Sequence, residues 1–300
     1  MKTKNYLLAL MAMALTLGSC SDNENGIGGE TSKYITVSTS IGNMTRVATD
    51  EKGGQTFEEG DEISVYAWTG DATVAPETSE RVVNNAINKL TNGSWVSTPQ
   101  MLWKNNRDKH YFIGVYPTAA ISDLSAGEYT FDANKQTESD LLVAVNPDGL
   151  SYNVDEPQTV PLTFTHVMAK LVVNLTYKNQ WGGIPTVEKV VVGNAAKEAT
   201  INYLTKVVTP STTAKEDFSL PEITENTKYV SVIIPQEEVT QLTIVIGGKN
   251  FVYDNGTPFK LESGKITTVN LEVGRDEIKL GDVKITNWED GSTFSGEALN

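Results

Sequence analysis

The feature that most constrains the fold of this chain is the recurrence of short segments rich in valine, isoleucine and aromatic residues. They are TVSTSI, EISVYAW, YFIGVYP, DLLVAV, KLVVNL, KVVVG, VSVIIP, LTIVIG, NFVY, TVNLEV and VKITNW. β-branched and aromatic side chains suit a pleated, half-buried surface, and the Gly, Asn, Asp and Pro clusters between the segments are typical of turns. Helical periodicity is almost absent, although the apolar spacing of Arg81–Leu90 would suit a short helix. The pattern predicts an all-β protein of β-sandwich type with few or no helices.

A change of phase near the middle of the chain marks a candidate domain boundary. In VPLTFTHVMAKLVVNL the apolar residues first fall on even positions, up to Phe164, and then on odd positions from Val167. Since strand side chains alternate between faces, this shift changes the buried face. A strand that leaves one sandwich and enters another would produce it, and so would a β-bulge within one sheet. Chain length favours the first explanation. We therefore predict two consecutive sandwiches, over residues 34–168 and 169–300.

The N-terminus has the layout of an export signal. In MKTKNYLLALMAMALTLGSC two lysines precede a short apolar core, which is too short for a spanning helix, and small residues precede Cys20. Leu17-Gly18-Ser19-Cys20 resembles a bacterial lipobox. We predict a lipoprotein signal peptide over residues 1–19, cleavage between Ser19 and Cys20, and a lipid on the Cys20 thiol. A plain signal peptide with an incidental cysteine is the alternative.

The residues after the predicted cleavage site favour a surface location. Cys20 is the only cysteine, so the chain has no disulfide and its one thiol can carry an anchor. Residues 20–33 are polar and rich in Gly and Asn, and we expect a flexible tether there. The acidic residues directly after Cys20 resemble the surface-export signal of some Gram-negative lipoproteins. These features predict a surface-exposed lipoprotein of the outer membrane.

The charge of the chain limits its partners. The formal net charge is −14, and loss of Lys2 and Lys4 with the signal peptide brings it to −16. A chain this acidic is unsuited to nucleic acid or to anionic lipid surfaces, both of which need clustered Lys and Arg. The body of the chain contains no apolar run of about 18 residues, the length that would span a membrane. We expect no nucleic-acid partner.

Residue patterns typical of catalysis or metal binding are not found. The two histidines, His110 and His166, lie far apart in the sequence, and His166 stands among apolar residues, where we expect a structural histidine bonded to backbone. No zinc motif, nucleophile elbow or phosphate-binding loop occurs. Gly247-Gly248 is interpreted as a hairpin turn, and Asn255-Gly256 as the turn of a hairpin over Phe251–Leu261. We predict no cofactor, no metal and no enzyme activity, with a carboxylate-based hydrolase as a remote alternative.

An ordered set of segments carries a family resemblance. After the lipobox come Thr45-Arg46, FEEGDEISVYAW, WKNNRDKHYFIGVYP, SDLLVA, VPLTFTHVMAKLVVNL and VKITNWEDG. In this order they resemble the fimbrillin-like family, the type V pilin subunits and related surface lipoproteins, from Cys20 to near the C-terminus. The most specific parts are F-x-x-GD-x-I-x-V-Y-A, SDLL-x-A and L-x-F-x-H-x-MAKL-x-V.

The resemblance implies a fold and a mode of assembly. It implies two transthyretin-like β-sandwich domains joined through a strand near the MAKL segment, and export to the outer membrane as a lipoprotein. An arginine-specific protease then cuts after the first strand and removes it together with the anchor. A strand from another copy, or from a related pilin subunit, fills the groove by β-strand addition. The implied role is adhesion as a fimbrial subunit.

The sequence contains parts that suit this scheme. The segment Lys33–Ile41 alternates, with apolar side chains and Thr39 on one face, and Arg46 follows it. We expect processing between Arg46 and Val47, with an ordinary surface arginine as the alternative. The donor-strand candidates near the C-terminus are Val283, Ile285 and Trp288.

The polar final tail gives no clear donor pattern, so other roles stay open. One is a non-polymerising surface lipoprotein that binds a glycan or a host ligand, for which tryptophans could provide a stacking platform. Another is a tip or anchor component of a fimbrium.

Overall fold

The computed structural model describes residues 33–42, 56–136, 138–153, 155–156, 158–239, 241–253 and 258–288. The predicted signal peptide and nearly all of the tether, with Ser19 and Cys20, lie outside these residues, and so do Arg46 and Val47.

The described chain is built from strands, which confirms the all-β prediction. The strands are β1 (Thr36–Ile41), β2 (Glu62–Thr69), β3 (Val83–Thr91), β4 (Ser94–Thr98), β5 (Lys109–Tyr116), β6 (Gly127–Thr130), β7 (Leu142–Ser151), β8 (Thr159–His166), β9 (Ala169–Tyr177), β10 (Val187–Ala196), β11 (Glu198–Asn202), β12 (Val207–Pro210), β13 (Lys215–Ser219), β14 (Glu222–Thr224), β15 (Lys228–Ile233), β16 (Gln236–Val239), β17 (Leu242–Ile246), β18 (Lys249–Tyr253), β19 (Phe259–Leu261), β20 (Lys265–Val273) and β21 (Ile278–Asn287). Two single 3₁₀ turns, η1 (Thr78–Glu80) and η2 (Asn179–Trp181), are the helical elements of the described part.

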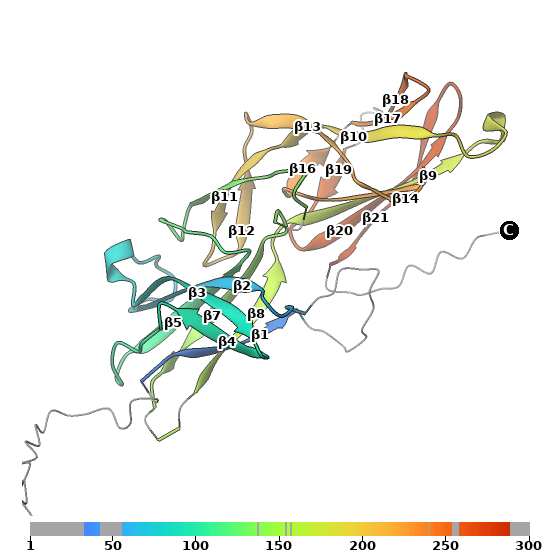
Figure 1. The fold of residues 1–300 in the computed structure, drawn as a ribbon. Coiled ribbons are helices and arrows are strands. Elements are labelled where there is room, and N and C mark those ends of the chain that lie inside the picture. The colour runs from blue at the N-terminus through green and yellow to red at the C-terminus, as the bar shows by residue number, and fades with distance from the viewer. Residues whose placement is uncertain are drawn as a thin grey trace, which may run out of the picture.

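A seven-stranded sheet forms the N-terminal half, in the order β1-β8-β7-β5-β2-β3-β4. It lies at one end of the molecule, in blue to green in Figure 1. The sheet curls until its outer strands meet, where the Trp95 indole Nε1 of β4 donates a hydrogen bond to Thr39 Oγ1 of β1 at 3.0 Å. The face turned inward by this curl carries what we call the N-terminal cluster, which includes Val37, Ile63, Phe112, Leu162 and Phe164.

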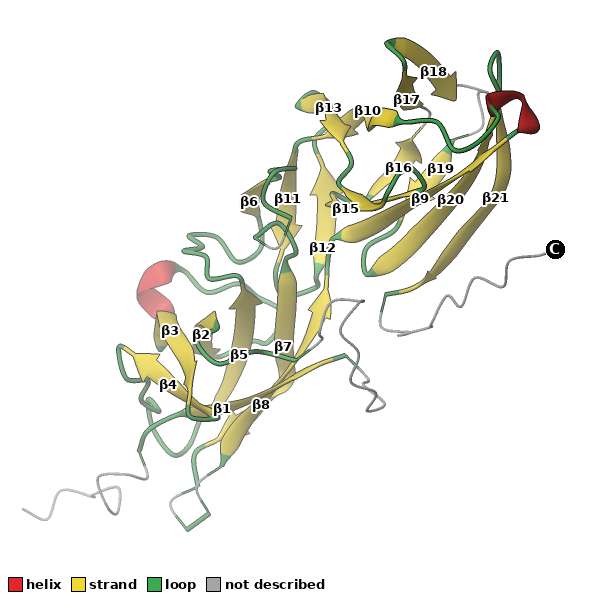
Figure 2. Ribbon diagram, turned by 45° about the vertical axis from the view of Figure 1, so that its right-hand side comes forward, coloured by secondary structure: helices red, strands yellow, loops and turns green. Residues whose placement is uncertain are grey.

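The C-terminal half contains a five-stranded sheet, β14-β15-β9-β20-β21, and a four-stranded sheet, β13-β10-β17-β18. Figure 2 shows β9, β20 and β21 side by side at the far end from β1. A second cluster of buried side chains, the main cluster, is continuous across both halves. It joins residues of the N-terminal half, such as Trp68 and Val143, to residues of the C-terminal half, such as Val192 and Leu271.

The change of phase in the sequence coincides with a change of sheet. β8 belongs to the seven-stranded sheet and β9 to the five-stranded one, so the chain crosses between sheets at Val167 and Met168. Both of these residues are buried, because at the crossing the two apolar faces meet. A ladder also links the two halves, since β6 pairs antiparallel with β11. The division into domains at residue 168 stays a prediction.

Two local predictions are wrong. Arg81–Leu90 forms no helix and instead contributes β3, which pairs with both β2 and β4. The register shifts along the β2–β3 ladder, and Asn85 adopts a φ of 56° there. The irregularity places the buried residues Val83 and Ala86 three positions apart, which imitates helical spacing.

The second error concerns pairing around Asn255-Gly256, which lies outside the described residues. β18 and β19, the flanks of that predicted hairpin, do not pair with each other. β18 pairs with β17 and β19 with β16. The turn at Gly247-Gly248 does form the predicted hairpin, because both glycines have positive φ, 58° and 72°.

Candidate functional site

The first strand is attached to the rest of the sheet by a single ladder. β1 runs parallel to β8, with register partners from Thr36↔Thr159 to Ile41↔Phe164. Beyond the ends of the ladder, Ile35 N donates to Met101 O at 3.0 Å, and Gly42 N donates to Phe164 O at 2.8 Å. β1 is therefore an edge strand.

The side chains of β1 alternate as the sequence predicts. Ile35, Val37 and Ile41 are buried in the N-terminal cluster. Thr39 is half-buried on the same face and accepts the Trp95 hydrogen bond. On the opposite, exposed face, Ser40 Oγ donates to Thr163 Oγ1 of β8 at 3.2 Å. One face of β1 thus closes an apolar core, and the other faces solvent.

β8 in turn depends on β1 for most of its pairing. β7 pairs with β8 only at Phe164, Thr165 and His166. Among the described strands, residues 159–163 of β8 have no ladder partner except β1. Loss of β1 would leave these backbone groups unpaired above a groove lined by Val160, Leu162 and Phe164.

Aromatic rings fill the end of this groove. Phe57 packs edge-on against Trp95, Tyr116 and Phe164, with ring centroids 5.3, 5.3 and 5.1 Å away. Gly42 precedes the segment 43–55, which carries Arg46 and Val47 and lies outside the described residues, and Phe57 is the second residue after that segment. Gly42 and Phe57 both contact Phe164. The segment with the predicted processing site therefore connects two points fixed at the same end of the groove.

The donor-strand candidates lie on the other half of the molecule. β21 forms the edge of the five-stranded sheet, and Val283 and Ile285 pair with the buried Val269 and Thr267 of β20. Register partners share a face, yet Val283 and Ile285 are 37% and 39% exposed. Trp288 differs from them, since it is only 4% exposed. Within one chain Val283 and Ile285 lie on the five-stranded sheet, whereas the β1 groove belongs to the seven-stranded one.

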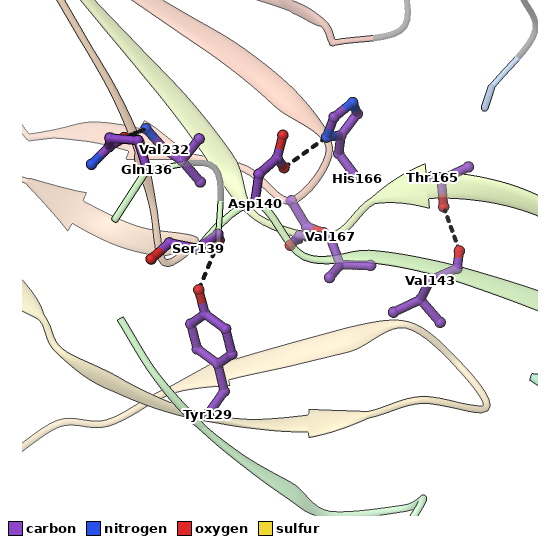
Figure 3. A network of polar contacts seen from close by, with 10 residues as sticks. Tyr129, Gln136, Ser139, Asp140, Val143, Thr165, His166, Val167 and Val232 are labelled. Atoms are coloured by element: carbon purple, nitrogen blue, oxygen red, sulfur yellow. Dashed lines mark hydrogen bonds and ion pairs between the residues drawn. The ribbon is translucent and has the colours of Figure 1, made fainter. Parts of the chain in front are cut away.

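A polar network holds the junction of the halves, as Figure 3 shows. Gln136 Oε1 accepts from Val232 N at 2.7 Å, and the Tyr129 hydroxyl donates to Ser139 O at 2.7 Å. His166 Nδ1 lies 2.8 Å from Asp140 Oδ1. The expectation that His166 bonds to the backbone is wrong, because its Nδ1 partner is a carboxylate. Burial raises the pKa of the Tyr129 hydroxyl well above its ordinary value, which keeps it a neutral donor.

A cleft lies beside the start of β1. It has a volume of about 760 Å³, and its lining includes Trp68, Val74, Arg81, Leu102 and Trp103. The Arg81 guanidinium is committed to the fold, because it donates to Ile121 O and Ser122 O, and burial lowers its pKa. Every tryptophan and tyrosine in the described part of the chain is buried or half-buried. The cleft therefore offers little open ring face for a sugar.

Within the described ranges no group of three His, Cys, Asp or Glu side chains is placed to hold a metal ion. No described helix is long and apolar enough to cross a membrane. The two histidines make separate contacts: His166 contacts Asp140, and His110 Nε2 accepts from Lys104 N at 3.1 Å.

Sequence reasoning missed several residues that build this site. Trp95 and Phe57 close the groove, and Asp140 orients His166. The alternation S-W-V-S-T around Trp95 is a strand signal that could have been found. Nothing in the sequence pairs Asp140 with His166, because Asp140 lies just before β7 and His166 ends β8, and only the register of these two strands brings the side chains together.

Comparison with known proteins supports the fold and the family. Residues 45–288 match a family model described as fimbrillin-like. No curated protein matches the sequence. A candidate cell adhesion protein from Bacteroides ovatus is similar in structure, with a TM-score of 0.64 and 17% identity over 85% of this chain and 98% of that chain. The tip fimbrial protein Mfa3 from Porphyromonas gingivalis, with a C-terminal truncation, gives a TM-score of 0.51 and 12% identity over 85% and 99%. At such identities the structures show a shared fold, whereas the family match covers most of the sequence. The chain therefore belongs to the fimbrillin-like family.

Proposed function

We propose that the chain is a fimbrial subunit that is exported as a surface lipoprotein, anchored through Cys20, and serves adhesion. Cleavage between Arg46 and Val47 removes β1 together with the lipid. A strand from another copy or a related subunit then takes the place of β1. The role is structural and involves no catalysis, cofactor or nucleic acid.

The observation that carries this proposal is the pairing of β8. Residues 159–163 pair with β1 alone among the described strands, above a groove of buried apolar side chains. An unpaired strand edge over an apolar groove is what an incoming strand needs, because main-chain hydrogen bonds supply affinity and alternating side chains supply specificity. The proposed cut lies in the segment that directly follows β1.

The donor strand is proposed to come from β21. Val283 and Ile285 lie on one side of an edge strand and are already partly exposed. They are spaced like Val37 and the half-buried Thr39 of β1 and could enter the same groove. Trp288 would have to leave its buried position for the whole segment to be donated.

The test is a polymerisation assay on the mature chain with Cys20→Ala, which removes the lipid. The protein is treated with an arginine-specific protease and run unboiled on a denaturing gel, and the product is sequenced from its N-terminus. We expect a ladder of oligomers whose chains begin at Val47. Arg46→Lys is the matched control, because it keeps the charge but is not cut, and it should stay monomeric.

A mixing experiment separates donor from acceptor. Val283→Asp/Ile285→Asp should disable donation and leave the groove intact, whereas uncut Arg46→Lys should donate but not accept. A mixture of the cut double variant with the uncut control should therefore stop at dimers, because head-to-tail contacts cannot propagate. Lys284→Glu, on the opposite face of β21, should leave the ladder unchanged.

A single trimmed band that stays monomeric would overturn the stalk assignment. The chain would then be a tip or anchor component, or a monomeric lipoprotein that binds a glycan or host ligand. The lipid anchor is tested separately by labelling cells with a fatty acid. Label should enter the wild-type chain and be absent from Cys20→Ala.

A further inference from the structure

The C-terminal end of β21 is fastened to the end of β8 by Trp288. The indole stacks on the His166 imidazole with centroids 4.0 Å apart and ring planes at 5°. The Trp288 amide donates to Gly264 O at 3.0 Å, and Gly264 N donates to Met168 O at 2.9 Å. Trp288 is thus held to the crossing between the two sheets by its ring and by its backbone.

Other contacts fix this arrangement on both sides. The His166 ring is oriented by Asp140 Oδ1 at 2.8 Å. The Lys170 ammonium lies 5.5 Å from the centroid of the Trp288 ring, within range of a cation–π contact. Ser263 Oγ donates to Val167 O at 2.8 Å, which ties the loop before β20 to the same crossing. We call the Trp288–His166 stack with its Asp140 contact the clasp.

The clasp and the β1 groove share one strand. Phe164, the register partner of Ile41, is two residues from His166 on β8. β7 holds only the last three residues of β8, whereas β1 holds the preceding ones. When β1 is absent, β8 keeps one short ladder, and the position of His166 loses the support of the strand that precedes it.

We propose that the clasp couples the two ends of the chain, so that undocking β1 loosens the C-terminal end of β21. β8 is the element whose order both β1 and the clasp favour. When β1 occupies the groove, it stabilises the position of His166 and thereby holds Trp288. When the groove is empty, Trp288 is released. By thermodynamic reciprocity, breaking the clasp weakens the docking of β1.

The consequence for assembly rests on the proposed function. A subunit whose β1 is in place donates β21 more slowly, because the clasp holds its C-terminal end, and a processed subunit has a freer β21 to donate. The coupling itself needs neither cleavage nor assembly, and it can be measured in the intact monomer. A failed polymerisation assay would leave it standing, and absence of coupling would leave strand addition standing.

The experiment is hydrogen exchange on the intact Cys20→Ala chain. Val37→Asp places a charge in the N-terminal cluster and should undock β1, and Ser38→Asp on the exposed face of the same strand is the matched control. We expect Val37→Asp to speed exchange at the amides of Val160, Leu162 and Thr163 and at the Trp288 amide by about fivefold or more, a modest coupling between sites. Ser38→Asp should change neither. Val37→Ala replaces the aspartate variant if the latter does not fold.

The reciprocal experiment starts from the clasp. Trp288→Ala should speed exchange at the amides of β1 by a similar factor. Trp181→Ala is the control, because Trp181 packs against Phe251 in the C-terminal half, away from β8. If Val37→Asp deprotects residues 159–163 while the Trp288 amide is unchanged, or if Trp288→Ala leaves β1 unaffected, the coupling is absent and the proposal is wrong.

Discussion

Ile41 of β1 and Phe164 of β8 are register partners in a parallel ladder, and both side chains are buried in the N-terminal cluster. The same phenylalanine packs against Phe57 at 5.1 Å and accepts the Gly42 amide through its carbonyl oxygen. Phe164 therefore contacts both flanks of the segment that contains Arg46. The docking of β1 and the two ends of the segment that contains the predicted cleavage site thus depend on the same residue.

Truncation of the Phe164 side chain should strongly destabilise the fold where β1 docks. The side chain is fully buried, so Phe164→Ala should lower the free energy of unfolding by about 3–5 kcal/mol, through lost burial and the cavity left behind. Urea unfolding followed by tryptophan fluorescence measures the change. Thr163→Ala, on the exposed face of the same strand, should stay within about 0.5 kcal/mol. If Phe164→Ala lowers the free energy of unfolding as little as Thr163→Ala does, the groove contributes little to stability.

Gly114 of β5 is required because Phe164 lies directly over it. A Cβ atom at position 114 would lie 2.6 Å from Phe164 Cζ, which is closer than atoms can pack. We expect Gly114→Ala to destabilise the fold by about 1–3 kcal/mol. In the double variant Gly114→Ala/Phe164→Leu the smaller leucine should make room, so the total loss should be less than the sum of the single losses. Simple additivity in urea unfolding would contradict this contact.

The elements that the sequence predicts well are those whose local signal agrees with their final environment. The segment before Arg46 alternates strictly, and β1 buries the predicted face. The phase change after Phe164 is visible because both flanking strands are apolar on one face, and the chain does change sheets there. In these places one period and one buried face describe the whole element.

The failures occur where long-range pairing overrides the local pattern. Asn85 takes a positive φ at an irregular register, and the resulting spacing imitates a helix. β18 and β19 flank a good turn sequence but find their partners elsewhere. The clasp was not predictable, because Trp288 and His166 are far apart in the chain and their stacking depends on how β8 and β21 are placed.

His110 should make stability depend on pH. Burial lowers its pKa below the ordinary value of 6.5, and its Nε2 must stay unprotonated to accept the Lys104 amide. As pH falls below 6.5, the unfolded chain binds a proton that the folded chain resists, so the free energy of unfolding decreases. This contribution is fully present above pH 6.5. NMR titration should place the His110 transition below 6.5, and one above it would contradict the expectation.

A variant isolates this effect from other titrating groups. His110→Gln should unfold more easily at every pH, because it loses the fit of the ring, but its stability should fall less steeply between about pH 7 and pH 5. An unchanged slope in denaturant unfolding would assign the pH dependence to carboxylates elsewhere.

The bond between Trp95 and Thr39 closes the curled sheet, and its removal should loosen β1 without touching the β1–β8 ladder. Thr39→Val keeps the shape but leaves the Trp95 Nε1 donor, which is half-buried, without its 3.0 Å partner. We expect a loss of about 1–3 kcal/mol in urea unfolding, the cost of an unsatisfied donor. The double variant Thr39→Val/Trp95→Phe should be less destabilising than the sum of the two single variants, because it leaves no polar group without a partner.

Hydrogen exchange tests whether the same bond holds β1 in place. Thr39→Val should speed exchange at the β1 amides, whereas Thr36→Val, which loses only an exposed contact between two hydroxyls, should not. If both variants behave alike, the Trp95 bond does not hold β1 in place, and the buried side chains of the strand alone secure it.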